Sequence, residues 1–182
     1  GLLIASLVGA ADLFSVSARN GASWNDKNAW SDKGCNQKKG NSTGTSSVDN
    51  VTICADDKIT VDANASVSAA SVVIQASGTL DNGTGGVLNV GRDFSNNGTF
   101  ASSAGTVIFN GSVDQTINGT NASTVFNNLT INKTAGTSVL LGDAVNASQT
   151  ITVTNILTLT SGLIKTAGGS PSNYIYLSKS DG

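Results

Sequence analysis

The sequence predicts an all-β protein, and three observations support this. The β-branched residues Val, Ile and Thr recur along the whole chain, and they favour strands. Residues that favour helices are scarce, because Glu and Met are absent and all 12 acidic residues are Asp. Short β-branched runs alternate with turns rich in Asn, Gly, Ser and Thr. A chain of 182 residues is long enough to bury the core of one domain.

The first ten residues form a short apolar run that is too brief for a transmembrane helix. We interpret residues 1–10 as the remnant of a secretory signal, with cleavage after Ala10, or alternatively after Ala18. Two other interpretations remain open. The run is either a buried strand of this fold or an apolar strand lent to a neighbouring subunit.

Residues 11–50 are predicted to hold the first strand and an N-terminal capping segment. Residues 13–18 alternate between apolar and polar side chains, which is typical of a strand. Trp24 and Trp30 follow, in a chain with few aromatic residues. We expect them to close the open end of the core; the alternative is an exposed indole platform that contacts a glycan.

The two cysteines, Cys35 and Cys54, are expected to form one disulfide, because an even number of cysteines in an exported chain is typical of a disulfide framework. This bond would tie the polar loop 31–50 to the strand that follows it. The alternative is a pair of reduced, buried thiols. No CxxC motif or Cys/His cluster accompanies them, so no metal site is predicted.

Internal repetition begins at about residue 50. The predicted strands are short, and Asn-Gly turns recur between them at irregular spacing. These strands cover residues 51–54, 59–62, 71–75, 87–90, 106–110, 128–132, 139–141, 150–154 and 156–160. Asn-Gly turns are typical of hairpins, so an antiparallel sandwich is one interpretation.

A longer repeat favours a different architecture. Residues 70–80, 126–136 and 151–163 are variants of one unit, which consists of a strand, a Gly turn and a second strand. This pattern predicts a right-handed parallel β-helix, or β-solenoid, with coils of about 20 residues and about six turns between residues 51 and 170. The side chains expected to point inward are Ile53, Val61, Ile74, Leu88, Val90, Phe100, Ile108, Phe126, Leu129, Ile131, Val153 and Leu157.

Several segments carry a resemblance to a known family. They include residues 23–31 (SWNDKNAWS), 48–53 (VDNVTI), 90–100 (VGRDFSNNGTF) and 124–132 (TVFNNLTIN). Together they resemble the β-solenoid repeat regions of large secreted bacterial surface proteins, such as autotransporter-like adhesins and the accessory protein of mannose-sensitive haemagglutinin pili. The resemblance covers roughly residues 14–166. It implies that residues 51–182 are solenoid coils, incomplete at their C-terminal end, and that the protein is secreted or displayed at the cell surface.

The available side chains restrict the chemistry. The absence of His excludes Ser-His-Asp and Cys-His systems, so an enzyme would depend on Asp together with Lys or Arg. The nearest candidates are Asp56-Asp57-Lys58 and Arg92-Asp93, and we interpret both as solvated turn residues. We predict no catalytic residue, cofactor or metal site. With a net charge of -2 and two Arg, the chain also lacks a nucleic-acid footprint.

The sequence therefore predicts a non-catalytic extracellular module with a structural or adhesive role. Its expected partners are glycans, surfaces or other cell-surface proteins, with end-to-end self-association as a further expectation. Two alternatives remain. One is a carbohydrate-active enzyme, similar to a lyase or glycosidase, on the same fold; the other is a subunit of an extracellular filament.

Overall fold

The computed structural model describes residues 9–16, 21–42, 44–121, 123–142, 149–166 and 174–177. Within these ranges the regular structure is β-strand, apart from one 3₁₀ turn at Lys27–Ala29. No helix in the described ranges is long and apolar enough to span a membrane. The predicted remnant of a signal, residues 1–10, lies outside the described residues except for Gly9 and Ala10.

The strands follow one another closely along the chain, as their bounds show. They are β1 (Asp12–Ser15), β2 (Ala22–Ser23), β3 (Trp30–Ser31), β4 (Asn50–Ile53), β5 (Lys58–Val61), β6 (Ser66–Ala69), β7 (Ser71–Ile74), β8 (Thr79–Asn82), β9 (Val87–Val90), β10 (Phe94–Asn96), β11 (Thr99–Ala101), β12 (Thr106–Phe109), β13 (Gln115–Asn118), β14 (Ser123–Asn132), β15 (Ser138–Leu141), β16 (Thr150–Ser161), β17 (Leu163–Thr166) and β18 (Tyr174–Leu177).

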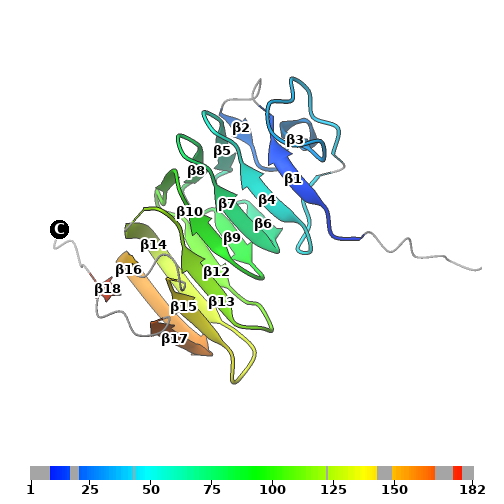
Figure 1. The fold of residues 1–182 in the computed structure, drawn as a ribbon. Coiled ribbons are helices and arrows are strands. Elements are labelled where there is room, and N and C mark those ends of the chain that lie inside the picture. The colour runs from blue at the N-terminus through cyan, green and yellow to red at the C-terminus, as the bar shows by residue number, and fades with distance from the viewer. Residues whose placement is uncertain are drawn as a thin grey trace, which may run out of the picture.

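These strands form three sheets, which are the faces of a stacked column (Figure 1). The first face has the order β17-β15-β13-β10-β7-β4-β1-β3, the second β11-β8-β5-β2 and the third β18-β16-β14-β12-β9-β6. Successive strands of the chain lie on successive faces, and each pairs in parallel with its counterpart in the neighbouring coil. The predicted parallel β-solenoid is therefore confirmed.

The Asn-Gly turns are corners of the coils and not hairpins. Among the described strands, only β1 and β3 pair antiparallel, so the antiparallel sandwich is excluded. Several corners require a left-handed backbone, with φ of 64° at Asp56, 58° at Asn64 and 62° at Ser77. Asn and Asp adopt this conformation more readily than most residues, which suits Asp56 and Asn64 to these corners.

The column has about five turns and not about six, because its coils are longer than predicted. Asn50 pairs with Ser71, which is 21 residues later, whereas Ser138 pairs with Leu163, which is 25 residues later. In the later coils, β14 and β16 are long strands that pair with each other throughout, with a register shift between Phe126 and Asn128. In each of these later coils, one long strand takes the place of two short strands of an earlier coil, such as β8 and β9.

The core consists of inward side chains that stack from coil to coil. Of the predicted inward set, all are buried except three. Phe100 and Leu157 are partly buried and pack against the core. Ile108 was predicted wrongly: it points outward and is only half-buried, because its neighbours Val107 and Phe109 occupy the inward positions of β12.

Aromatic rings fill the middle of the column. Phe126 lies with its ring centroid 6.0 Å from that of Phe94, 5.5 Å from that of Phe100 and 6.4 Å from that of Phe109. The four rings come from β10, β11, β12 and β14, so they join the faces of two adjoining coils. Such tilted and edge-to-face contacts are the favoured geometries for aromatic pairs.

Candidate functional site

The N-terminal end of the column gathers most of the residues that the sequence singled out. β1 pairs in parallel with β4, and β2 pairs in parallel with β5, so the first coil lies within residues 11–50. The outer edge of β1 pairs with β3, which runs antiparallel and covers that edge of the first face. An antiparallel strand cannot continue a parallel stack, so β3 ends the sheet at this point.

Trp24 and Trp30 are both buried, with 1% and 0% of their surfaces exposed. Their rings meet edge to face with centroids 5.2 Å apart. The Trp30 indole N–H donates to the Trp24 carbonyl at 2.8 Å, and the Trp24 indole N–H donates to the Thr45 hydroxyl at 2.7 Å. Rings buried in this way present no face to a sugar, so the alternative of an exposed glycan platform has no counterpart in this geometry. The pair instead packs within the core at its N-terminal end.

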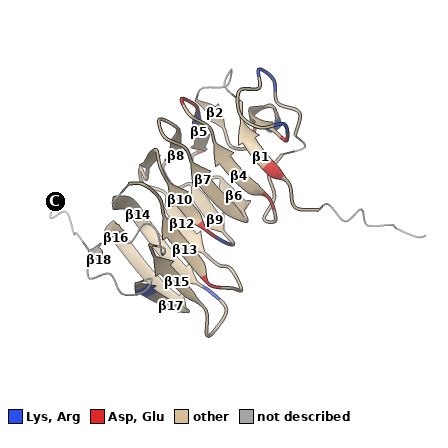
Figure 2. Cartoon of the chain, viewed as in Figure 1, with Lys and Arg blue, Asp and Glu red and all other residues tan. Residues whose placement is uncertain are grey.

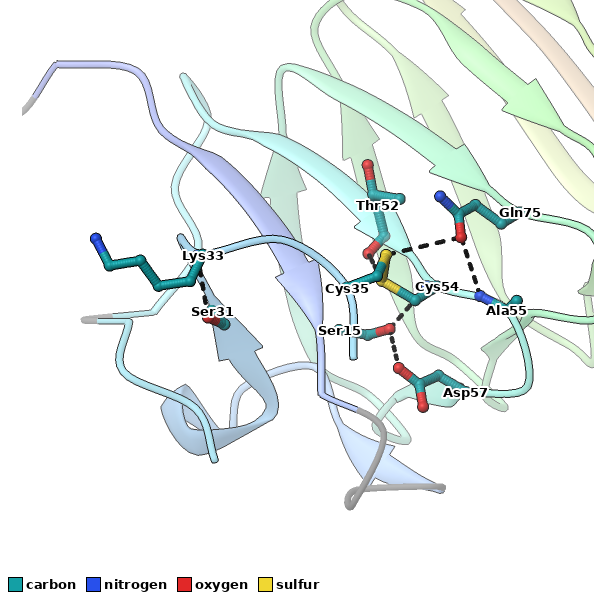
Figure 3. Close-up of a disulfide and its surroundings, with 9 residues drawn as sticks. All are labelled: Ser15, Ser31, Lys33, Cys35, Thr52, Cys54, Ala55, Asp57 and Gln75. Carbon is teal, nitrogen blue, oxygen red and sulfur yellow. Dashed lines mark hydrogen bonds between the residues drawn. A yellow bond between two sulfur atoms is a disulfide. The ribbon is translucent and has the colours of Figure 1, made fainter. Parts of the chain in front are cut away.

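The predicted disulfide between Cys35 and Cys54 is confirmed. It joins the loop between β3 and β4 to the residue that follows β4 (Figure 3). Beside it, the Gln75 side-chain carbonyl accepts the backbone N–H of Ala55 at 3.1 Å. The bond therefore fixes the loop against the second and third coils of the first face.

The same loop is held at its other end by Trp30. The Trp30 carbonyl accepts the backbone N–H groups of Asn41 at 3.0 Å and Ser42 at 3.2 Å. The Asn41 amide donates to the Asp32 carboxylate at 2.7 Å. Gly40 lies so close to Asn28 that a Cβ at this position would collide with the Asn28 backbone. The loop thus has a defined course over residues 32–42.

A buried carboxylate lies next to the disulfide. The Ser15 hydroxyl donates to Asp57 at 2.5 Å and accepts the backbone N–H of Cys54 at 2.8 Å (Figure 3). Asp57 is 2% exposed. Burial raises the pKa of Asp57 above its ordinary value of 3.8, and the charge of Asp56 adds to this rise, although the hydrogen bond from Ser15 opposes it.

This raised pKa gives a testable pH dependence. A carboxyl group that binds its proton more tightly in the folded state lowers the free energy of unfolding as the pH rises from 3.8 through the folded pKa. Asn does not titrate and keeps an acceptor for Ser15. We therefore expect Asp57→Asn to be more stable than the parent above the folded pKa, with the difference disappearing at lower pH.

Urea denaturation across pH 3 to 7 measures this difference. Asp12→Asn is the matched control, since Asp12 is an exposed carboxylate that also accepts a side-chain hydrogen bond, from Asn50. Parallel pH profiles for the parent and Asp57→Asn would contradict the prediction.

The other predicted acid–base candidates do not converge. Asp56 is exposed at a corner, while Lys58 lies 3.4 Å from Asp81. Asp93 accepts the backbone N–H of Thr116 at 2.7 Å, and Arg92 contributes a carbonyl that accepts from Gln115. Asp56, Arg92 and Asp93 are exposed, as predicted for solvated turn residues. The same prediction is wrong for Asp57, which is buried, and for Lys58, which lies in β5.

Lys133 and Gln115 form a buried polar cluster that sequence analysis did not identify. The Lys133 ammonium donates to the Val113 carbonyl at 2.8 Å and to the Gln115 side-chain carbonyl at 2.5 Å. Gln115 in turn donates to the Val90 carbonyl at 2.9 Å. Burial lowers the pKa of Lys133, and the charges of Asp114 and Asp93 oppose this decrease. The cluster satisfies corner carbonyls of two neighbouring coils, which is a structural role.

Two hollows on the surface of the described residues are lined by candidate acid–base groups. One, of about 160 Å³, contains Asp32 and Asp49 but no basic side chain. The other, of about 330 Å³, contains Arg92 but no carboxylate. Within the described part of the chain, no three His, Cys, Asp or Glu residues are grouped so that they could hold a metal ion.

Comparison of the chain with protein-family models, with curated proteins and with solved structures finds no match.

Proposed function

We propose that this chain is a non-catalytic, extracellular β-solenoid module with a structural and adhesive role. One observation carries the structural part: seven carboxylates join neighbouring coils to each other. Each accepts a hydrogen bond from a residue of an adjoining coil. The pairs are Asp12 with Asn50, Asp49 with Ala11, Asp57 with Ser15, Asp62 with Ser23, Asp81 with Ser103, Asp93 with Thr116 and Asp114 with Ser138. Carboxylates bound in this way support a rigid column.

The outward surface supports the adhesive part. On the third face, neutral hydroxyl and amide side chains point outward from β6, β9 and β14, at Ser68, Asn89 and Thr130. The apolar Ile108 of β12 lies between Asn89 and Thr130 in this row. Some of these amides form ladders: Asn110 donates to Asn89 at 3.4 Å, and Asn155 donates to Asn128 at 2.8 Å. A flat surface of hydroxyls and amides suits hydrogen bonding to glycans, to other surfaces or to proteins.

The extracellular location is supported by the disulfide. Disulfides form and persist in oxidising compartments, outside the cell or in the secretory route. The resemblance to repeat regions of secreted bacterial surface proteins points to the same location. We propose that the module is secreted or displayed at the cell surface, and that its partners are glycans or other surface components.

A carbohydrate-active enzyme on the same fold has less support. Such an enzyme requires an acid and a base, or a carboxylate with a cation, within reach of one sugar. The two hollows separate these groups, since carboxylates line one and Arg92 lines the other.

A filament subunit is the second candidate, because the last described coil leaves apolar side chains exposed. Leu159 is 62% exposed and Leu163 is 53% exposed. End-to-end self-association would cover them, whereas β3 and the Trp24–Trp30 pair close the opposite end of the column.

An assay for activity on polysaccharides tests the proposal. The purified chain, incubated with calcium and a panel of acidic and neutral polysaccharides, is expected to produce no more reducing or unsaturated ends than Asp93→Ala. Product formation by the parent that Asp93→Ala lacks would refute the non-catalytic role and favour the enzyme.

A further inference from the structure

Positive charge is concentrated in one short stretch at the N-terminal cap. Four of the ten basic residues lie within residues 27–39, which contain only one acidic residue, Asp32. These four are Lys27, Lys33, Lys38 and Lys39, and all are exposed. We call them the basic cap surface; Figure 2 shows blue segments in the loop that follows β3.

The charges of the basic cap surface are available to a partner. Lys33 lies 3.4 Å from Asp32, but both side chains are largely exposed, so the pair is weak. Among the described residues, no carboxylate lies within ion-pair distance of Lys27, Lys38 or Lys39. Other lysines are engaged elsewhere: Lys58 pairs with Asp81, and Lys133 is buried.

The backbone that carries these lysines is held in place before any partner binds. The disulfide fixes Cys35, and the Trp30 carbonyl holds Asn41 and Ser42. The Asn41–Asp32 hydrogen bond closes the loop between these two points. A surface whose backbone is already ordered loses less conformational entropy on binding.

The chemistry of the loop favours one class of polyanion. Residues 32–42 contain no aromatic side chain that could stack on a base, and both nearby indoles are buried. They also contain no large aliphatic side chain that could enter a lipid bilayer. Instead, the amides of Asn36 and Gln37 directly precede Lys38 and Lys39, which suits a ligand with both hydroxyls and negative charges.

We propose that the basic cap surface binds an acidic polysaccharide. The ammonium groups pair with carboxylate or sulfate groups along the sugar chain, while Asn36 and Gln37 hydrogen-bond to its hydroxyls. This inference rests on the proposed adhesive function and specifies its ligand class and location.

The test compares two double variants that change the net charge equally. Lys38→Gln/Lys39→Gln alters the basic cap surface, and Lys58→Gln/Lys165→Gln alters lysines elsewhere on the column. Binding of the full chain to polygalacturonate and to heparin is measured by calorimetry at low and high salt, with dextran as the neutral polysaccharide. We expect the first variant to bind the acidic polysaccharides at least about fivefold more weakly, and the second to bind like the parent.

The disulfide provides an independent readout. Reducing the bond with dithiothreitol is expected to weaken binding to polygalacturonate, because the loop is then less ordered before binding. Unchanged binding by protein shown to be reduced would contradict the role assigned to the ordered loop.

The remaining outcomes separate this inference from the proposed function. Binding of the acidic polysaccharides that both variants weaken equally, or that neither variant weakens, would overturn the basic cap surface as the site while leaving adhesion intact. Dextran bound as tightly as polygalacturonate would overturn the assignment to an acidic ligand. Binding of a short DNA duplex or of anionic lipid vesicles as tightly as polygalacturonate would overturn the assignment to polysaccharide. Absence of binding to every polysaccharide would overturn both this inference and the proposed adhesion to glycans.

Discussion

Phe126→Ala is expected to lower the free energy of unfolding by about 3 to 5 kcal/mol. Phe126 is fully buried and contacts three other aromatic rings, which come from the preceding coil. Alanine would leave a cavity that the stacked backbone cannot collapse to fill, because the strand spacing is fixed by hydrogen bonds on both sides. Urea denaturation followed by circular dichroism measures the loss.

Val125→Ala is the control on the same strand, since Val125 points outward and is 40% exposed. Its effect is expected to stay within about 0.5 kcal/mol. Comparable losses in the two variants would contradict the inward and outward assignment of β14.

The second large effect is expected from removal of the disulfide. Cys35→Ser/Cys54→Ser should lower the free energy of unfolding by about 2 to 4 kcal/mol, because the unfolded chain regains the freedom of a closed loop. The two cysteines are separated by 19 positions, so this loop is of moderate length. Denaturation in urea without reductant measures the change.

Reductant provides the matched control for this prediction. Dithiothreitol is expected to destabilise the parent to the level of the double variant and to leave the variant unchanged. Two titratable thiols in the unreduced, denatured parent would show that the bond is absent from the protein.

Sequence analysis located most of the strands in which apolar residues occupy the inward positions, but it missed β6, where Val67 and Ala69 face the core. It identified the regions of β4, β5, β7, β9 and β12, where Val and Ile face the core. It missed strands in which inward positions are polar. Asn82 in β8, Asn96 in β10 and Gln115 in β13 are buried through hydrogen bonds to neighbouring coils, so the expected alternation is hidden.

The direction of side chains within one strand was a separate difficulty. Residues 106–110 were recognised as a strand, but Val107, Ile108 and Phe109 are consecutive and all apolar. Alternate side chains of a strand point to opposite faces, so the pattern fits equally well with Ile108 inward or with Val107 and Phe109 inward. Only the packing of Phe109 against Phe94 and Phe126 determines the choice.

The candidate site was only partly predictable for a related reason. Pairing of Cys35 with Cys54 follows from the number of cysteines and the exported context. The burial of Asp57 and Lys133 depends on partners in other coils: Ser15 lies 42 positions from Asp57, and Gln115 lies 18 positions from Lys133. Local sequence patterns contain no signal for contacts of this kind.

The direction of the hydrogen bonds in the column determines how the protein responds to tension. Strands of neighbouring coils pair along the column axis, so a force applied between the two ends of the described column loads the coils in series. Coils at an end then detach one after another, and a 21-residue coil releases a length of about 70 Å. The segment between Cys35 and Cys54 cannot extend while the disulfide is intact. The length released at the N-terminal end is therefore about 65 Å shorter than for the reduced chain.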